Sequence, residues 1–599
     1  MKRRTFLKRA GTAVAVSFLP RSPMPGQRPG RRRPGDPGWP SAAAWNRLRA
    51  DVDGNLIPVP FPLADCANDV GGDACTALLA NIKNPWYVGD QPGLTQTLGW
   101  VDAWYTRPSV YAVAAQTAEH IAAAVNFARD NDIRLVVKGG GHSYQGGSNA
   151  PDSLLAWTRR MNHVTLHERF VPVRCHDAHA GVPAVSCDAG AVWMQAYSEV
   201  TTKGSRYVQG GGCTTVGVAG LVQSGGFGNF SKHYGTASAH LLEAEIVTAD
   251  GRIRAVNACS DPDLFWALKG GGGGTLGIVT RLTLRTHDLP EYFGGALFRV
   301  TAASDAAFQR LLRQFVGFYS ERLFNQHWGE SVYISPQNSL GISMVSWGLA
   351  PDQGKRTWQP FLDWIAERRG DYTMAETPHI VSVPAQKWWD PAWWRQNNLP
   401  DVYAADSRTG ADPHNVWWAG DAGQVAWTIY GYESLWLPQH LLIGNAQTEL
   451  ATALFDGSRH QGISLHFNKG LAGSPREAQE ATRNTAMNPA VLDAFALAIV
   501  ADAGGGYPGI RGHEPDEAAA RSSRDAISRC MTPLRRVADG GGAYSAESSF
   551  FQENWQHSYW GSNYGRLASV KRQYDPAGLF FVHHGVGSEE WSDDGFTRR

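Results

Sequence analysis

The chain has 599 residues, of which 43% are hydrophobic and 18% charged, a composition typical of a large folded protein of roughly two to four domains and not of a disordered chain. Lysine and arginine together number 55, as do aspartate and glutamate, so the formal net charge is zero and the basic excess expected of a nucleic-acid binder is missing. No apolar run is long enough to predict an ordinary transmembrane helix.

The first residues have the form of an export signal. Residues 1–9 contain paired arginines followed by Phe-Leu-Lys, and residues 10–19 are mildly apolar. This order resembles a twin-arginine export signal and predicts a protein delivered to the periplasm or outside the cell; a plain basic tail is the alternative. We expect residues 1–38 to comprise this signal and a linker. Because residues 1–33 hold ten basic residues and no acidic one, the processed protein would be acidic.

Seven cysteines occur, and in an exported protein their odd number predicts a thiol that is not part of a disulfide. Closeness in sequence makes Cys66 with Cys75, and Cys175 with Cys187, the candidate disulfides.

No metal site is predicted. The chain lacks a Cys-x-x-Cys pair, which is the usual mark of structural zinc. His176 and His179 flank Asp177 in a predicted loop, where such a cluster is usually solvated.

A strand, a helix and a second strand lead into a first glycine-rich loop. Residues 111–115 are the first predicted strand, and Thr117 is the predicted N-cap of an amphipathic helix. Residues 134–137 are the second strand, which runs directly into the loop Lys-Gly-Gly-Gly-His-Ser-Tyr-Gln-Gly-Gly at 138–147. Glycines after a strand let backbone amides face a bound anion without an intervening Cβ. His142 lies inside this loop, either facing a ligand or as a solvated turn residue.

A second glycine cluster spans residues 209–228 and is almost free of charge. Such a stretch indicates close approach of the backbone to a large ligand. Cys213 lies in it, either as a point of covalent attachment or as a small buried core residue.

A third cluster, residues 272–277, satisfies the G-x-G-x-x-G pattern in its letters alone. It follows a predicted helix at 263–268 and precedes a predicted strand at 278–284, whereas a nicotinamide-binding Rossmann fingerprint requires a strand, a loop and then a helix. We therefore reject that type of site. Residues 242–248 and 253–256 are predicted to pair as a hairpin.

The two loops, the hairpin and the segment DLFWALKGGGGGTLGIVT together resemble the flavin-binding domain of the vanillyl-alcohol oxidase / p-cresol methylhydroxylase superfamily. Within it the sequence is similar to the berberine bridge enzyme-like FAD-linked oxidases. The C-terminal segments YWGSNYGRL and VKRQYDPAGLF resemble that group's closing segment, and the tail FVHHGVGSE looks closest to microbial members of the isoamyl-alcohol oxidase type.

This resemblance implies an α+β fold in which a two-part FAD-binding domain encloses an inserted substrate domain, itself an antiparallel sheet covered by helices. We expect an N-terminal extension at 39–103, an FAD-binding domain at 104–288, a substrate domain at 289–539 and a completing C-terminal segment at 540–599.

The resemblance also assigns cofactor positions. His142 and Cys213 match the residues that bond to the flavin 8α-methyl and C6, so FAD held by two covalent links is expected; both side chains have nucleophilic character. Val218 matches a position associated with oxygen access, and a small branched residue there favours an oxidase over a dehydrogenase. The other expected FAD contacts are Gly139, Gly140, Gly141, Ser143, Gly146, Gly217, Gly220, Gly225, Gly226, Gly228, Gly277, Ile278, Val279 and Asn563.

The implied reaction is transfer of a hydride from a substrate CH–OH group, in an alcohol or carbohydrate, to the flavin, with dioxygen as acceptor and hydrogen peroxide as product. Many relatives carry a tyrosine as base where this chain has Glu547, with Tyr544 three residues earlier. A predicted strand at 463–469 offers His466 as another candidate, because alternation places Ser464, His466 and Asn468 on one face.

The middle of the chain is rich in tryptophan, which is expected mainly to form core and in part to wall a site for flat or apolar substrates. Residues 492–500 and 518–527 are predicted helices. Three alternatives stay open: oxidation of a C–N bond, as in hydroxynicotine oxidase-like relatives; an FAD-linked dehydrogenase; and a flavoprotein that binds without efficient turnover.

Overall fold

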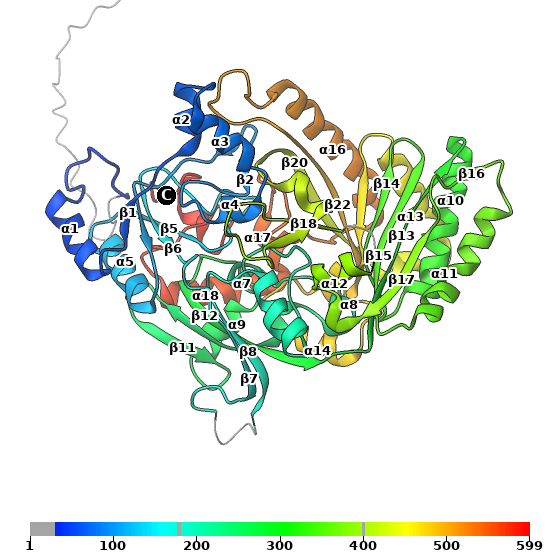
Figure 1. The fold of residues 1–599 in the computed structure, drawn as a ribbon, viewed down its shortest axis with the longest axis horizontal. Coiled ribbons are helices and arrows are strands. Elements are labelled where there is room, and N and C mark those ends of the chain that lie inside the picture. Colours follow the sequence, from blue (N-terminus) through cyan, green and yellow to red (C-terminus); the bar gives the residue numbers. More distant parts are fainter. Residues whose placement is uncertain (1–29, 176–180, 398–401) are drawn as a thin grey trace, which may run out of the picture.

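The computed structural model describes residues 30–175, 181–397 and 402–599. The predicted export signal within residues 1–29, and the cluster of His176, Asp177 and His179, lie outside the described residues. Figure 1 shows the first and last parts of the chain together on the left of the molecule and a large sheet with its covering helices on the right. Among the residues described, no helix is both long and apolar enough to cross a membrane.

A small sheet carries the first glycine-rich loop. Its order is β1–β4–β6–β5, where β1 is Leu56–Pro58, β4 is Tyr111–Ala114, β6 is Ser153–Trp157 and β5 is Arg134–Lys138. The helix α5 (Ala118–Asp130) follows β4, and the Thr117 hydroxyl accepts a hydrogen bond from the His120 amide at 3.3 Å, as the sequence predicts. Its apolar face is fully buried between this sheet and α1 (Ala42–Asp51). The loop therefore emerges from a rigid strand end.

A second, antiparallel sheet carries the rest of the glycine-rich segments. Its order is β11 (Ile253–Asn257), β10 (Leu241–Val247), β12 (Ile278–Asp288), β8 (Val182–Asp188) and β7 (Val164–Phe170). Strand β9 (Arg206–Val208) pairs with the C-terminal end of β12. The helix α9 (Pro262–Leu268) precedes the third glycine cluster, and β12 follows it. The order helix, loop, strand confirms the rejection of a Rossmann fingerprint.

The middle of the chain forms a large sheet of order β16–β13–β15–β14–β21–β22–β20–β2–β3, with β17 paired to β13. The strands are Tyr372–Thr373, Tyr292–Ala302, Ser339–Trp347, Trp328–Ser335, Ile463–His466, Ala494–Gly504, Trp427–Pro438, Thr97–Trp100, Trp104–Tyr105 and His379–Pro384. One face packs on α10 (Asp305–Phe318), α11 (Pro351–Ala366), α13 (Asn445–Ser458) and α16 (Glu517–Val537), seen at the right and top of Figure 1. The opposite face is turned toward the glycine-rich loops.

The predicted helix at 492–500 is wrong, because these residues lie mostly in β22 (Ala494–Gly504). This strand pairs on one edge with β20 and on the other with β21, and residues 494–500 are all buried, on both faces of the sheet, as one continuous apolar run. A run of this kind has no alternation that distinguishes a strand from a buried helix. The predicted helix at 518–527 is confirmed within α16.

The N-terminal part is built into both halves of the molecule. Strand β1 pairs with β4, while β2 pairs in parallel with β20 of the large sheet. Residues 30–38, predicted as linker, are anchored as well: the Arg31 guanidinium donates hydrogen bonds to the carbonyls of Gly595, Gly578 and Leu579. The predicted export signal, if cleaved, would have to be cut before Arg31 to preserve this contact.

The C-terminal helices α17 (Trp555–Trp560) and α18 (Tyr564–Tyr574) lie near α9, and Phe580 forms a parallel bridge with Leu135 of β5. The last residues of the chain therefore complete the side of the molecule that the first glycine-rich loop occupies.

Of the candidate disulfides, Cys66–Cys75 is confirmed and Cys175–Cys187 is wrong. Cys175 bonds instead to Cys259, which is 84 residues away in sequence, and Cys187 is a buried free thiol on β8. Closeness in sequence gives no information about a pairing that the sheet brings together from two hairpins.

Candidate active site

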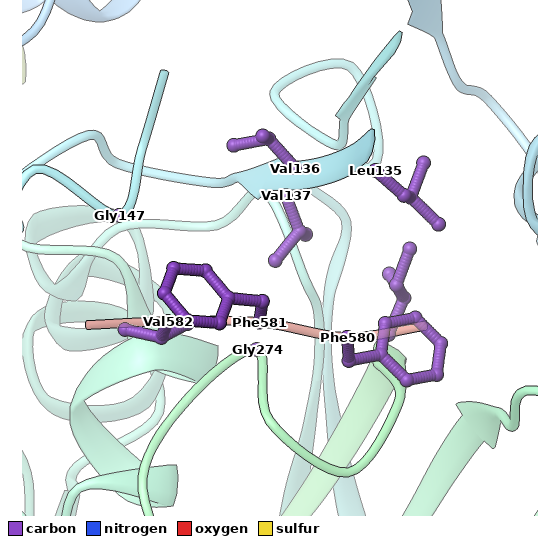
Figure 2. A pocket seen from close by; sticks show the side chains of 9 residues that line it. Leu135, Val136, Val137, Gly147, Gly274, Phe580, Phe581 and Val582 are labelled. Carbon is purple, nitrogen blue, oxygen red and sulfur yellow. The ribbon is translucent and has the colours of Figure 1, made fainter. Parts of the chain in front are cut away.

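A cavity of about 1100 Å³ separates the glycine-rich loops from the bare face of the large sheet. It exceeds the range of ~300–1,000 Å³ that is usual for small-molecule sites. A narrow apolar recess opens between β5 and the C-terminal segment, lined by Val137, Gly147, Gly274 and Val582, which also line the large cavity (Figure 2). The volume suits a long cofactor together with a substrate.

The first and second glycine-rich loops meet backbone to backbone at one end of this cavity. A Cβ added to Gly140 would lie 2.6 Å from the Gly217 nitrogen, and one added to Gly217 would lie 2.9 Å from the Gly140 nitrogen. A larger residue at either position would force the two loops apart. Near this contact the His142 Nε2 lies 3.4 Å from the Thr215 hydroxyl, and Cys213 lines the same cavity. The two predicted attachment residues thus face one space.

The two side chains differ in readiness to react. Desolvation lowers the pKa of His142 to about 4, so its imidazole is neutral at neutral pH and has a free electron pair. Desolvation and then the neighbouring Asp421 carboxyl raise the pKa of Cys213 well above that of an ordinary thiol. The thiol therefore needs a base before it can act as a nucleophile.

Most of the predicted cofactor contacts line the cavity. These are Gly139, Gly140, Gly141, His142, Ser143, Cys213, Gly217, Gly220, Gly277, Ile278 and Val279.

Six predicted contacts do not line it. Side chains at Gly225, Gly226 and Gly228 would collide with Met487, with Leu221 and with the Gly210 carbonyl, so these glycines allow the chain to pack on itself. Gly146 lies against the Trp104 ring, and the Asn563 amide donates to the Met487 carbonyl at 2.7 Å.

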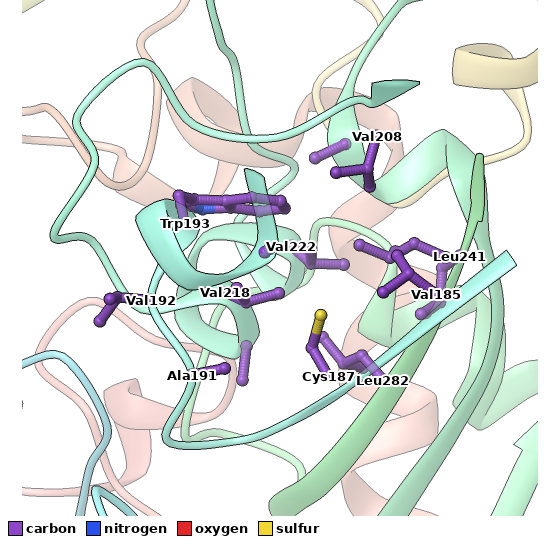
Figure 3. Packing of buried hydrophobic residues seen from close by; sticks show 14 of the residues in the cluster. Val185, Cys187, Ala191, Val192, Trp193, Val208, Val218, Val222, Leu241 and Leu282 are labelled. Atoms are coloured by element: carbon purple, nitrogen blue, oxygen red, sulfur yellow. The ribbon is translucent and has the colours of Figure 1, made fainter. Parts of the chain in front are cut away.

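Val218, the residue expected to govern oxygen access, is the sixth and lies in the hydrophobic core. It is the first residue of α7 (Val218–Gln223), is fully buried, and packs in the same cluster as Val222 and Cys187 (Figure 3). Residues 218 and 222 share one face of the helix, while Gly220 and Gln223 line the cavity from another. Its position gives no support to a role in oxygen access.

The three candidate bases all line the cavity, and each has a different environment. The Glu547 carboxylate forms an ion pair with Lys469, with Oε2 and Nζ 2.5 Å apart. The Tyr544 hydroxyl accepts a hydrogen bond from the Gly226 amide at 3.3 Å, and burial raises the Tyr544 pKa well above its ordinary value. His466 lies 3.0 Å from the Ser464 hydroxyl, and burial, reinforced by Lys469, lowers its pKa well below the ordinary value.

The cavity contains further charged groups that sequence reasoning missed, namely Glu330, Asp421 and Lys469. Lys469 follows the predicted face of Ser464, His466 and Asn468, and the chain leaves β21 there in a short turn that directs Lys469 into the site as well. Asp421 comes from a turn after the small β18–β19 hairpin (Tyr403–Ala405 and Val416–Trp418). No local sequence pattern marks either Glu330 or Asp421.

Some tryptophans form the core and others line the cavity, as the sequence predicts. Trp389 and Trp436 are fully buried core residues. The aromatic side of the cavity is formed by Trp388, Trp394, Trp417, Trp418 and Trp427, and the Trp418 indole donates to the Gly212 carbonyl at 2.9 Å.

Several buried polar atoms that lack a partner among the described residues lie at this cavity. They include atoms of Gln96, Gln145, His584, Asn229, His466 and Asn468, all of which line it. Buried polar groups in folded proteins are nearly always hydrogen-bonded, so these atoms indicate a bound polar group. A cavity lined by glycines and by polar atoms without hydrogen-bond partners fits a dinucleotide such as FAD.

Comparison with known proteins agrees with this geometry. A family model of the FAD binding domain matches residues 109–257, and a model described as berberine and berberine like matches residues 543–587. The chain is 30% identical to the FAD-linked oxidoreductase malF of Malbranchea aurantiaca, over 95% of this chain and 94% of that protein. It is 29% identical to the VAO-type flavoprotein oxidase VAO615 of Thermothelomyces thermophilus, over 99% of this chain and 98% of that protein.

Solved structures give the same result for the fold. The VAO-type flavoprotein MtVAO615 from Myceliophthora thermophila C1 superimposes with a TM-score of 0.76 at 25% identity, covering 94% of this chain and 99% of that chain. The glucooligosaccharide oxidase of Acremonium strictum, with its 6-S-cysteinyl, 8α-N1-histidyl FAD, superimposes with a TM-score of 0.64 at 20% identity, covering 90% and 99%. The predicted α+β fold is confirmed.

Proposed function

Since this chain belongs to the berberine bridge enzyme-like family of FAD-linked oxidoreductases, we propose that it is an oxidase that removes a hydride from a substrate CH–OH group, in an alcohol or carbohydrate, and passes the electrons to dioxygen. The observation that carries the proposal is the single cavity that His142, Cys213 and three acid–base candidates share.

We further propose that His142 and Cys213 bind the FAD covalently. A neutral imidazole and a thiol beside the Asp421 carboxyl have the chemistry that two such bonds require. The dual linkage of the glucooligosaccharide oxidase, a protein of the same fold, supports this arrangement. Backbone amides of 139–143 would face the diphosphate, and the wall formed by Gly220 and Gly277 would lie against the rings.

When bound, the flavin supplies the hydride acceptor and the reaction with dioxygen. The residues of this chain orient the substrate, exclude water with the tryptophan wall, and accept a proton from the substrate hydroxyl. The carboxyl groups that line the cavity, among them Glu547 in its ion pair with Lys469, would supply the acceptor for that proton.

Oxidation of a C–N bond is the second candidate function. The cavity holds the carboxyl groups of Glu330, Asp421 and Glu547 against a single lysine, Lys469, and its aromatic wall can contact a cation. A substrate amine would fit this balance of charge.

Assays on the purified protein with its flavin bound test these functions directly. Flavin bleaching without oxygen, and peroxide release in air, are measured with benzyl alcohol, isoamyl alcohol, cello-oligosaccharides and N-methylbenzylamine. Turnover of an alcohol or sugar supports the proposal, and turnover of the amine alone supports the second candidate. Bleaching in the absence of oxygen without peroxide in air would indicate a dehydrogenase and overturn the assignment of dioxygen as acceptor.

A further inference from the structure

Glu330 has a backbone conformation that is unusual for its place in a strand. It lies within β14 (Trp328–Ser335), yet its φ is +61°, in the left-handed region that L-residues other than glycine rarely occupy. Such strain persists only where the surrounding structure enforces it, and it is concentrated at functional sites.

The strain has a clear consequence for the side chain. Along β14 the side chains of Trp328, Val332 and Ile334 point into the helix-covered core, and regular alternation would send Glu330 there too. Instead Glu330 and its neighbour Ser331 both line the cavity. The left-handed turn therefore moves a carboxyl group out of the apolar core and into the site.

Within the site this carboxyl is close to the proposed flavin attachment point and has few donors. A Cβ on Gly212, the residue before Cys213, would lie 3.4 Å from Glu330 Oε1. Among the described residues, the side-chain donor that reaches Glu330 is the Asn468 amide, at 3.1 Å. The Oδ1 atoms of Asn468 and Asn229 are buried beside it without partners. The subsite is rich in acceptors and suits a group that donates protons.

The charges around Glu330 leave it able to exchange a proton near neutral pH. Desolvation raises the pKa of Glu330 to about 7; Lys469 opposes this, while Asp421 and Glu547 reinforce it. Other titratable groups near it are Cys213, Tyr197 and Tyr207, whose pKa values burial raises well above their ordinary values. By contrast, the Glu547 carboxylate already accepts a hydrogen bond from the Lys469 ammonium group.

We propose that Glu330 is a catalytic residue whose carboxylate accepts the proton that the substrate hydroxyl, or the corresponding amine nitrogen, releases as its carbon gives up a hydride. This inference rests on the proposed function. The substrate loses a C–H bond, with its electron pair passing to the flavin, and an O–H bond, whose electron pair forms the new C=O bond while the proton forms the Glu330 carboxylic acid. A bound flavin would pass the hydride's electron pair to dioxygen, which would leave as hydrogen peroxide with that hydrogen and the proton held by Glu330, so that the Glu330 carboxylate is regenerated.

The test compares Glu330→Gln with the control Glu433→Gln, which removes a largely buried carboxyl on β20 that pairs with Arg535 outside the cavity. The first readout needs no substrate: the visible absorbance of the flavin in the holoenzyme is titrated from pH 5 to 9. Wild type and Glu433→Gln are expected to show a transition near pH 7, and Glu330→Gln is expected to lack it. Glu330→Asp should restore a transition, because aspartate tolerates the left-handed conformation.

The second readout is the rate of flavin reduction with the fastest substrate of the panel above. Glu330→Gln should slow reduction by ~10²–10⁴-fold and remove the pH dependence near 7, while substrate binding is retained. Asp421 also lines the cavity, and because burial raises its pKa to about 6 it is expected to titrate in every variant. A flavin transition near pH 7 that survives in Glu330→Gln, or reduction at the wild-type rate with its pH dependence intact, would overturn the proposal. If no substrate reacts, the proposed function fails while the absorbance titration still decides whether Glu330 titrates beside the flavin.

Discussion

Replacing Gly140 with alanine tests whether contact between the two glycine-rich loops builds the site. The new Cβ would lie 2.6 Å from the Gly217 nitrogen and 3.3 Å from the Thr215 carbonyl oxygen. Ordinary contact requires roughly 3.5 Å, so the loops must separate by about 1 Å. Overpacking of this kind costs about 1–3 kcal/mol of stability, and a displacement of about 1 Å at reacting groups costs about 100-fold in rate.

We therefore expect Gly140→Ala to unfold at a lower temperature than wild type and to contain less flavin bonded at Cys213, measured by mass spectrometry of digested protein. Gly71→Ala is the control, because a Cβ there meets nothing within 4 Å. If Gly140→Ala matched wild type in both the unfolding midpoint and the flavin content, the account of the loops as a tight backbone contact would be refuted.

Three further predictions concern stability. The imidazole of the buried His240 has its Nδ1 3.1 Å from His287 Nε2, and burial lowers its pKa to about 4. Below pH 6.5 the unfolded chain therefore binds a proton at this residue that the folded protein does not, and from pH 7 to 5 the free energy of unfolding should fall by about 2 kcal/mol for His240. A denaturation series showing equal or greater stability at pH 5 would contradict this. Removing the Cys175–Cys259 disulfide by a double change to serine should cost about 4 kcal/mol because it closes a long loop, and a non-reducing peptide map that pairs Cys175 with Cys187 would show the assignment to be wrong. A chain that begins at residue 34 should be less stable than one that begins at residue 30 by about 2 kcal/mol or more, because Arg31 is lost from the C-terminal carbonyls and from its stacking on Trp591; equal unfolding midpoints would contradict this.

The sequence predicts those parts of the fold in which local pattern and local physics coincide. Thr117 caps α5, the helix buries its apolar face, and the third glycine cluster follows a helix, all as expected. Strand β22 could not be predicted, because its residues 494–500 are buried on both faces and therefore have no period of two.

The residues of the candidate site also differ in whether a local sequence pattern can identify them. Loop composition marks the segments that hold His142 and Cys213, the family resemblance selects these two residues, and strand alternation selects Ser464 and His466 of β21; all four line the cavity. Glu330 could not be identified in this way, since alternation assigns it to the core face and only its left-handed φ moves it into the cavity. The resemblance to the family carries no information about the side-chain direction of Val218, which lies in the core because α7 begins there and turns that residue inward.

The mass of the flavin-bearing peptides tests the central claim most directly. The purified holoprotein is precipitated in acid, digested, and searched for FAD-derived mass on each peptide, with His142→Ala and Cys213→Ala as single variants and the two combined. We predict flavin on both His142 and Cys213 in the wild type, on one of them in each single variant, and on neither in the double variant. Acid-stable flavin in the double variant, or flavin bonded to any other residue of the wild type, would contradict the account.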